Sequence, residues 1–123
     1  MHNLNDIIEN IINSLDESLL KKRFLRVKNK NKFTGHCYVA TETLYHLLGD
    51  DQKKIYRPAL LKINDDTHWF LKNKLNGEII DITKEQFDFE LDYGNAKNCF
   101  FLTKEPSKRT KILISRIYEK NCY

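Results

Sequence analysis

The chain has 123 residues, of which 41% are hydrophobic and 31% are charged, and its formal net charge is +4. This length suits one domain, and the balance of apolar and charged residues is that of a folded globular protein rather than a disordered one. It also excludes a transmembrane span, because no apolar run approaches the roughly 18 residues that a span needs.

We therefore expect a single domain over residues 1–123. The first residues carry acids and lack the basic start of a signal peptide. The three cysteines are odd in number and widely spaced, which is typical of free thiols rather than of a disulfide framework. Together these features predict a cytoplasmic protein in a reducing setting, with no membrane partner.

The N-terminal part of the chain combines an apolar periodicity with a basic run. Isoleucine and leucine recur at three- and four-residue spacings over residues 4–20, which predicts a helix capped by Asn3 or Asn5 that packs on the core. Seven basic residues and no acid follow in Lys21–Lys32. We prefer a solvated surface here, since the net charge is low and no nucleic-acid motif accompanies the run. The alternative is a patch for an acidic partner.

The stretch from Thr34 to Leu48 carries the residue with the clearest chemical potential. Cys37 follows a Thr-Gly-His turn and begins a predicted amphipathic helix, which we expect Gly49 to end. A thiol at a helix N-terminus lies near the positive end of the helix dipole, which favours the thiolate. His46 lies too far along this helix to be the partner of the thiol, and it is expected to be a surface residue.

After that helix, the pattern changes to strands. Residues 56–63, 67–72 and 78–82 are predicted strands, and the loop before the last one contains an Asn-Gly hairpin signal. Strands joined by a short loop are antiparallel neighbours. We therefore expect His68, near the start of one strand, to lie across from Asp81, near the end of the next. Both would lie at one end of the hairpin, where the Cys37 helix can dock.

The C-terminal third is predicted as a helical turn at residues 83–87, a last strand at 99–102 and a helix at 106–118. The basic start of that helix, Lys108–Lys111, opposes the helix dipole. It therefore indicates a contact with something anionic, either the acidic segment 85–92 or an acidic partner. The fold class is α+β, with the N-terminal and Cys-bearing helices packed on a small antiparallel sheet and a C-terminal helix.

The order Cys, His and Asp on separate elements is the arrangement that cysteine nucleophile chemistry needs. Cys37 would attack a carbonyl carbon, His68 would accept and return the proton, and Asp81 would hold the His tautomer. The backbone N–H of Cys37 and the side chain of Asn31, preferred over Asn29, would stabilise the oxyanion. Each residue alone has an ordinary explanation, as a buried thiol, a core histidine or a cap. Their combination favours a triad.

His36 and Trp69, next to the thiol and the histidine in sequence, are further candidates for lining the substrate site. A metal site would need Cys37 and His68 with either His36 or Asp81, but no CxxC or HxxxH pair supports it. We therefore expect no metal and no cofactor. A non-enzymatic interaction protein on the same fold is the second hypothesis.

Three short motifs resemble the transglutaminase-like branch of the papain-like cysteine superfamily. They are Gly35-His36-Cys37, His68-Trp69 and Asp81-Ile82-Thr83, and they span residues 35–83. Ile82 stands where that branch often has proline. The resemblance implies a papain-like core and a peptidase-like or transglutaminase-like enzyme acting on a protein or peptide. An upstream Gln or Asn as oxyanion donor is likewise a feature of papain-like folds.

The whole chain is also similar to short proteins encoded by tailed phages, through its Cys-Tyr-Val-Ala, His-Trp and Pro-Ser-Lys-Arg elements. No activity comes with this second resemblance. It implies a phage-encoded protein in the host cell cytoplasm that acts on a host or phage protein, or that binds a host factor without catalysis.

Overall fold

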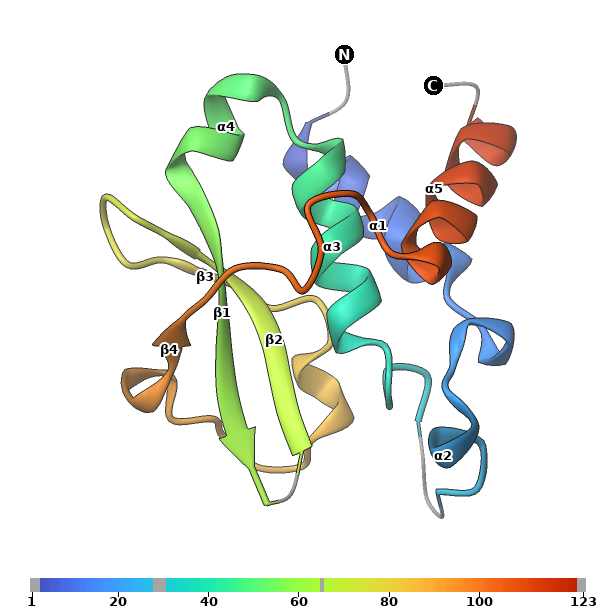
Figure 1. Cartoon of the computed structure of the whole chain (residues 1–123), viewed down its shortest axis with the longest axis horizontal. Coiled ribbons are helices and arrows are strands. Elements are labelled where there is room, and N and C mark those ends of the chain that lie inside the picture. The colour runs from blue at the N-terminus through green and yellow to red at the C-terminus, as the bar shows by residue number, and fades with distance from the viewer. Residues whose placement is uncertain (1–2, 28–30, 65, 122–123) are drawn as a thin grey trace.

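The structure, a computed structural model, describes residues 3–27, 31–64 and 66–121 and has an α+β fold (Figure 1). Its antiparallel sheet has the strand order β3-β2-β1-β4. The strands are β1 (Tyr56–Ile63), β2 (Asp66–Asn73), β3 (Ile79–Ile80) and β4 (Lys97–Asn98). The helices are α1 (Leu4–Ser14), α2 (Lys22–Leu25), α3 (Cys37–Leu47), α4 (Asp50–Ile55) and α5 (Lys108–Asn121), with 3-10 turns η1 (Glu17–Leu19), η2 (Lys84–Gln86) and η3 (Tyr93–Asn95).

The hairpin of β1 and β2 is the centre of the sheet. All eight residues of each strand pair, from Tyr56 with Asn73 to Ile63 with Asp66, where strands were predicted at 56–63 and 67–72. Asn64 in the connecting turn has φ 56°, a left-handed conformation that asparagine tolerates better than most residues. Since side chains alternate along a strand, the two faces of β2 differ sharply in what they contact.

One face of the sheet is covered by helices, and Figure 1 shows α1, α3 and α5 gathered on that side. The core between these layers includes fully buried Ile11, Leu44, Leu71, Leu113 and Ile117. Burying side chains of this size is worth roughly 1.5–3 kcal/mol each, so this layer supplies much of the stabilisation. Helix α3 lies in its middle and contacts α1, α5, β1 and β2.

The other face of the sheet carries a smaller core. Ala59, Leu61 and Phe70 are buried there, and the segment between β3 and β4 covers them with Leu91, Tyr93 and other partly buried side chains. His68 is on the same face as Phe70, because the two residues are separated by one position on β2. The segment after β3 is thereby brought against His68.

The helical predictions hold for α1, α3 and α5, but their ends differ. Helix α1 ends at Ser14 because Leu15 is extended, with ψ 134°, and the side chain of Asp16 caps η1 instead. Leu19 and Leu20 are buried although they lie beyond the end of α1. The apolar spacing over residues 4–20 therefore identified the side chains that face the core, but not one continuous helix.

Helix α3 ends at Leu47 with Leu48 as its C-cap, so it stops next to Gly49 as predicted. Gly49 itself has φ −66° rather than a left-handed conformation, and it is the N-cap of α4, a helix that was not predicted.

Two strand predictions also need correction. Strand β3 is shorter than the predicted 78–82, and the last strand is Lys97–Asn98 rather than 99–102. Phe100 is 91% exposed, so the aromatic run after β4 does not form a buried strand. The terminal helix begins two residues after Pro106, and its Ile112 is 39% exposed whereas Leu113 is fully buried.

The anionic partner of the α5 N-terminus is Glu42 of α3. Its carboxylate is fully buried, and it accepts hydrogen bonds from the Ser107 N–H at 2.9 Å and the Tyr38 hydroxyl at 3.2 Å. A negative charge at a helix N-terminus is favourable, and these donors offset its desolvation. Within the described residues no ion pair joins Lys108–Lys111 to the acidic segment 85–92, so that predicted contact is wrong.

None of the helices in the described ranges has both the length and the apolar character needed to cross a lipid bilayer.

Candidate active site

The turn before α3 presents Cys37 at the start of the helix. Gly35 has φ +80°, and a Cβ at this position would lie 2.7 Å from Cγ of Phe24, so the turn requires glycine. Cys37 is the first residue of α3 and is partly exposed. Its thiol donates a weak hydrogen bond to the carbonyl oxygen of Thr67, at 3.6 Å.

His68 is 1% exposed and forms the inner part of the site. Its Nε2 lies 2.6 Å from Oδ2 of Asp81. An ionised carboxylate only accepts hydrogen bonds, so Nε2 of His68 carries a proton and donates it to Asp81. The other ring nitrogen, Nδ1, is therefore the one that can interact with a different group. The ring of Phe87 contacts His68 edge-on, with centroids 4.9 Å apart, and helps to exclude water.

The expected proximity of His68 and Asp81 is present, but the register differs from the prediction. Leu71 pairs with Ile80, and the strand β3 ends there. Continued by one residue, this register sets Asp81 opposite Phe70, so His68 lies diagonal to Asp81 rather than directly across. Diagonal neighbours on one face remain within reach of long side chains.

Asp81 is held by a second donor, the hydroxyl of Tyr93, which lies 2.7 Å from Oδ2. The carboxyl group is 2% exposed, so an ionised form requires such donors to offset desolvation. Burial, together with the carboxylate of Asp81, raises the pKa of Tyr93 above its ordinary value, and Tyr93 remains a hydrogen-bond donor.

The electrostatics favour the charged form of His68. Burial alone would lower its pKa, but the hydrogen bond with Asp81 and the electrostatic influence of Asp81 and Cys37 outweigh burial, and the pKa is raised to about 9. A histidine that readily holds a second proton is suited to take one from a thiol.

Gln86 is a site residue that sequence reasoning missed. Its Nε2 lies 3.2 Å from Nδ1 of His68 and 3.2 Å from Oγ1 of Thr83, which is buried. The turn 83–87 was predicted as helical, and it is present as η2. This predicted turn follows Asp81 closely, so it was the feature of the sequence that could have indicated Gln86 as a neighbour of the site. Tyr93 and Phe87 were also missed, and no motif marks either of them.

The predicted oxyanion donor Asn31 is engaged elsewhere. Its Nδ2 donates to the carbonyl oxygen of Glu85 at 2.7 Å, and its Oδ1 accepts from the Phe33 N–H at 2.9 Å. The side chain therefore ties the loop before Cys37 to η2. Asn29 lies outside the described residues. The backbone N–H of Cys37, at the start of α3, remains the predicted donor.

His36 and Trp69, the two residues predicted to line the substrate site, contact different parts of the fold. Trp69 is on the helical face of β2, opposite to His68, and its ring stacks on Phe101 with centroids 6.0 Å apart. His36 is 3% exposed and lines a pocket of about 270 Å³ whose other walls include Leu15 and residues of η1. Burial lowers the pKa of His36, so it is neutral at pH 7.

Cys99, the second thiol in the described residues, is partly exposed, and partial burial raises its pKa to about 11. Cys122 lies outside the described residues. Within the described ranges, no group of three or more His, Cys, Asp or Glu side chains is arranged to hold a metal ion.

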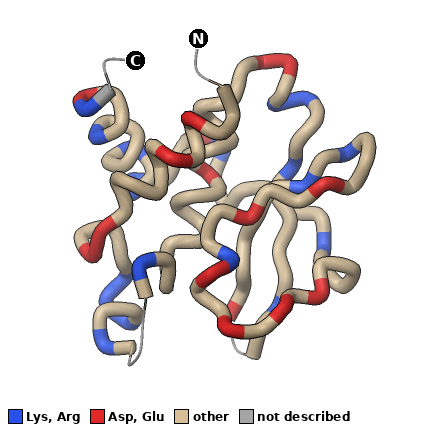
Figure 2. The backbone as a smooth tube through the Cα atoms, turned by 180° about the vertical axis from the view of Figure 1, so that it is seen from behind, with Lys and Arg blue, Asp and Glu red and all other residues tan. Residues whose placement is uncertain are grey.

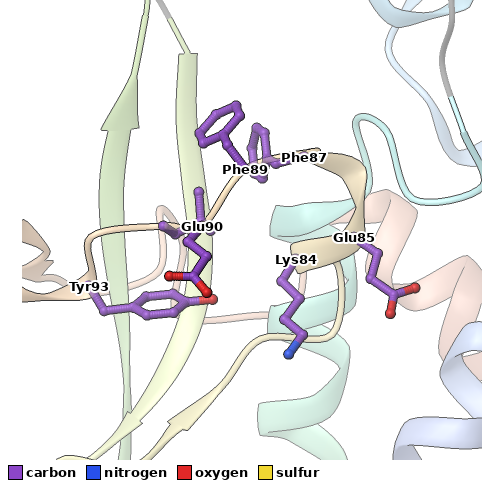
Figure 3. Close-up of a pocket in the computed structure, with 7 residues that line it drawn as sticks. Lys84, Glu85, Phe87, Phe89, Glu90 and Tyr93 are labelled. Carbon is purple, nitrogen blue, oxygen red and sulfur yellow. The ribbon is translucent and has the colours of Figure 1, made fainter.

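A shallow pocket of about 390 Å³ adjoins the site (Figure 3). Phe87 and Tyr93 belong both to its lining and to the surroundings of His68 and Asp81. Figure 3 shows Phe87 and Phe89 together along the segment after η2, with Tyr93 on the neighbouring part of the chain. Figure 2 shows acidic residues spaced along the same segment, so the surface beside the site is negatively charged. These residues are Glu85, Asp88, Glu90 and Asp92, all of them exposed.

No protein-family model, curated protein or solved structure matched this chain.

Proposed function

We propose that the protein is a cysteine-nucleophile amide hydrolase or acyltransferase of the papain-like, transglutaminase-like type, with Cys37, His68 and Asp81 as its triad. The observation that carries this proposal is the buried pair of His68 and Asp81 beside a thiol at a helix N-terminus. Burying the ionisable groups of His68 and Asp81 costs desolvation free energy, and such pairs are often found at functional sites. The pair interacts with Cys37, the nucleophile that the order Cys, His and Asp in the sequence indicates.

In the proposed reaction, Sγ of Cys37 attacks the carbonyl carbon of an amide while its proton passes to Nδ1 of His68. The carbon–nitrogen bond then breaks, and His68 returns the proton to the leaving amine. The resulting thioester is attacked by water, which gives hydrolysis, or by a second amine, which gives acyl transfer. His68 accepts the proton of that attacking group, and the thiol of Cys37 is restored. Asp81 stabilises the imidazolium throughout.

The substrate in this proposal is a protein or peptide in the cytoplasm, or in the host cytoplasm if the chain is phage-encoded. A reducing compartment suits the mechanism because it keeps the nucleophilic thiol free. The basic residues of Lys21–Lys32 and Lys108–Lys111 are proposed contacts for an acidic partner. Lys28 and Lys30, which fall in the first of these ranges, lie outside the described residues.

Acylation by an activated ester tests the proposal. On incubation with p-nitrophenyl acetate, we expect a burst of p-nitrophenol and a thioester adduct on the Cys37 peptide, located by mass spectrometry. Cys37→Ala should abolish the burst, and Asp81→Asn should slow it strongly, whereas Cys99→Ala should leave it unchanged. An adduct spread equally over the cysteines, or a burst that survives Cys37→Ala, would sink the proposal.

A non-enzymatic interaction protein remains the second candidate, and the exposed apolar side chains after β4 favour it. Phe100 is 91% and Leu102 is 76% exposed, and neighbouring apolar groups of this kind often mark protein contacts. If this were the only function, Phe100→Ala would abolish partner capture while the reactivity of Cys37 would show no dependence on His68. The two candidates thus differ in which substitution has an effect.

A further inference from the structure

A second cavity, of about 240 Å³, lies at the end of the central hairpin that is remote from His68. In Figure 1, α4 and the loop between β2 and β3 lie at this end of the sheet, whereas β2 starts at the other end. Arg57, which lines the cavity, is four positions along β1 from Leu61, the cross-strand partner of His68. Four strand residues span roughly 13 Å, so this cavity is separate from the proposed triad.

Three cationic side chains line this cavity. They are Lys53 of α4, Arg57 of β1 and Lys74, which follows β2, and the described lining contains no Asp or Glu. None of the three forms an ion pair with another described residue. Arg57 is also paired directly opposite Lys72, and like charges in this relation are destabilising. An anion in the cavity would offset this repulsion.

Aromatic rings supply the apolar part of the same cavity. Tyr45 of α3 and Tyr56 of β1 are half-buried, and the ring of Tyr45 is held against Phe101 with centroids 5.5 Å apart. Phe100, by contrast, is 91% exposed. An exposed ring beside cationic groups is a surface on which a nucleobase can stack, and such stacking tolerates any base because every base has a π-face.

The backbone around the cavity is fixed by hydrogen bonds between separate segments. The N–H of Lys74 donates to the carbonyl oxygen of Ile55 at 2.7 Å, and the N–H of Cys99 donates to that of Pro58 at 3.1 Å. Such preorganisation lowers the cost of ordering the site around a ligand. Asn98 of β4 also lines the cavity, and its amide offers both a donor and an acceptor, as the edge of a nucleobase does. The ring of a phosphotyrosine has no such edge.

We propose that this cavity binds a mononucleotide, with the phosphate among the three cationic side chains and the base on Phe100. The guanidinium of Arg57 suits a phosphate because it can donate two parallel hydrogen bonds, and the lysines add point charges. The volume of about 240 Å³ suits a ligand of this size, since it lies just below the range of drug-sized sites, about 300–1,000 Å³. Binding here does not depend on the proposed triad.

Isothermal titration calorimetry of the full chain with AMP at low salt tests this proposal. AMP should bind, and inorganic phosphate and adenosine should each bind about tenfold more weakly or worse, because each lacks half of the contacts. Arg57→Gln should weaken AMP binding about tenfold or more, the effect of losing charge-assisted hydrogen bonds, and Phe100→Ala about fivefold or more. Raising the salt concentration should weaken AMP binding in the parent chain.

The matched control is a second lysine. Lys74→Gln should weaken AMP binding about threefold or more, whereas Lys62→Gln, at an exposed position of β1 outside the cavity, should bind AMP as the parent chain does. Cys37→Ala should also bind AMP normally, which separates this site from the proposed triad. Lys74 and Phe100 are exposed, so their variants decide the test even if Arg57→Gln does not fold.

Four results would overturn the proposal. The first is the absence of AMP binding to the folded parent chain at concentrations up to about 5 mM. The second is equal affinity for AMP and inorganic phosphate, which would mean a simple anion site without stacking. The third is tighter binding of O-phosphotyrosine than of AMP, which would indicate a phosphopeptide site. The fourth is an equal loss in Lys74→Gln and Lys62→Gln, because that outcome reflects only the general charge of the chain.

Discussion

The raised pKa of His68 makes the stability of the fold dependent on pH in a specific direction. The group has a pKa of 6.5 when unperturbed and about 9 in the folded chain. A basic group whose folded pKa is raised stabilises the fold fully below its unfolded pKa, and that contribution is lost as the pH rises through the folded pKa. Unfolding free energy should therefore fall between about pH 6.5 and pH 9.

The size of the effect follows from the same two values. Each pH unit between them is worth about 1.4 kcal/mol, so the full contribution is about 3 kcal/mol. This is a large fraction of the 5–15 kcal/mol that small domains typically have. His68 is 1% exposed, so solvent screening does not diminish it.

Guanidinium denaturation at pH 6.0 and pH 9.5, followed by circular dichroism, measures this difference. Asp81→Asn is the comparison, since it removes the carboxylate that supports the imidazolium and should remove most of the pH-dependent part. Groups that titrate elsewhere in the chain contribute equally to both proteins and cancel in the difference. Equal pH dependence in the two proteins, or a parent chain more stable at pH 9.5 than at pH 6.0, would refute the reasoning.

Three further predictions concern the core, a buried carboxylate and the second thiol. Leu113→Ala should lower the free energy of unfolding by about 2–5 kcal/mol in urea titrations, because Leu113 is fully buried. Ile112→Ala, at a 39% exposed site of the same helix, should lower it by about 1 kcal/mol or less. Similar losses in the two variants would contradict the assignment of the buried and exposed faces of α5. Glu42→Ala should lower the unfolding free energy by about 1–3 kcal/mol, since the Tyr38 hydroxyl and the Ser107 N–H lose their acceptor. Glu9→Ala, at an exposed position, should change it by less than about 0.5 kcal/mol. Equal effects would argue against Glu42 as the partner of α5. Cys99 should react with iodoacetamide appreciably only as the pH approaches about 11, the pKa to which burial raises it, and fast labelling near neutral pH by peptide mapping would contradict its burial.

The parts of the fold that local patterns encode were predictable. Strands β1 and β2 and their turn follow from alternation and from a cluster of turn residues, and the start of α3 at Cys37 follows from a glycine turn before an apolar periodicity. The pairing of His68 with Asp81 was also accessible, since a hairpin brings together residues only 13 positions apart. The diagonal register was not, because it follows from the pairing of Leu71 with Ile80, which the predicted strand limits did not specify.

The residues that complete the site were set by tertiary packing. Tyr93 reaches Asp81, and Gln86 reaches His68, only because the segment after β3 folds back over the second face of the sheet. Glu42 meets the start of α5 across 65 positions of sequence. These segments lack periodicity, so nothing local specifies their neighbours.

The sequence by itself determined the element types at the centre of the chain, because helix and strand periods and turn residues act over a few positions. It also singled out the three residues that we propose for nucleophile chemistry. Tertiary structure alone decided that the histidine is buried, that its Nε2 meets Asp81, and that the side-chain amide of Gln86 lies 3.2 Å from its Nδ1. Burial and hydrogen-bond partners depend on the whole packed chain, and they decide the protonation of a site.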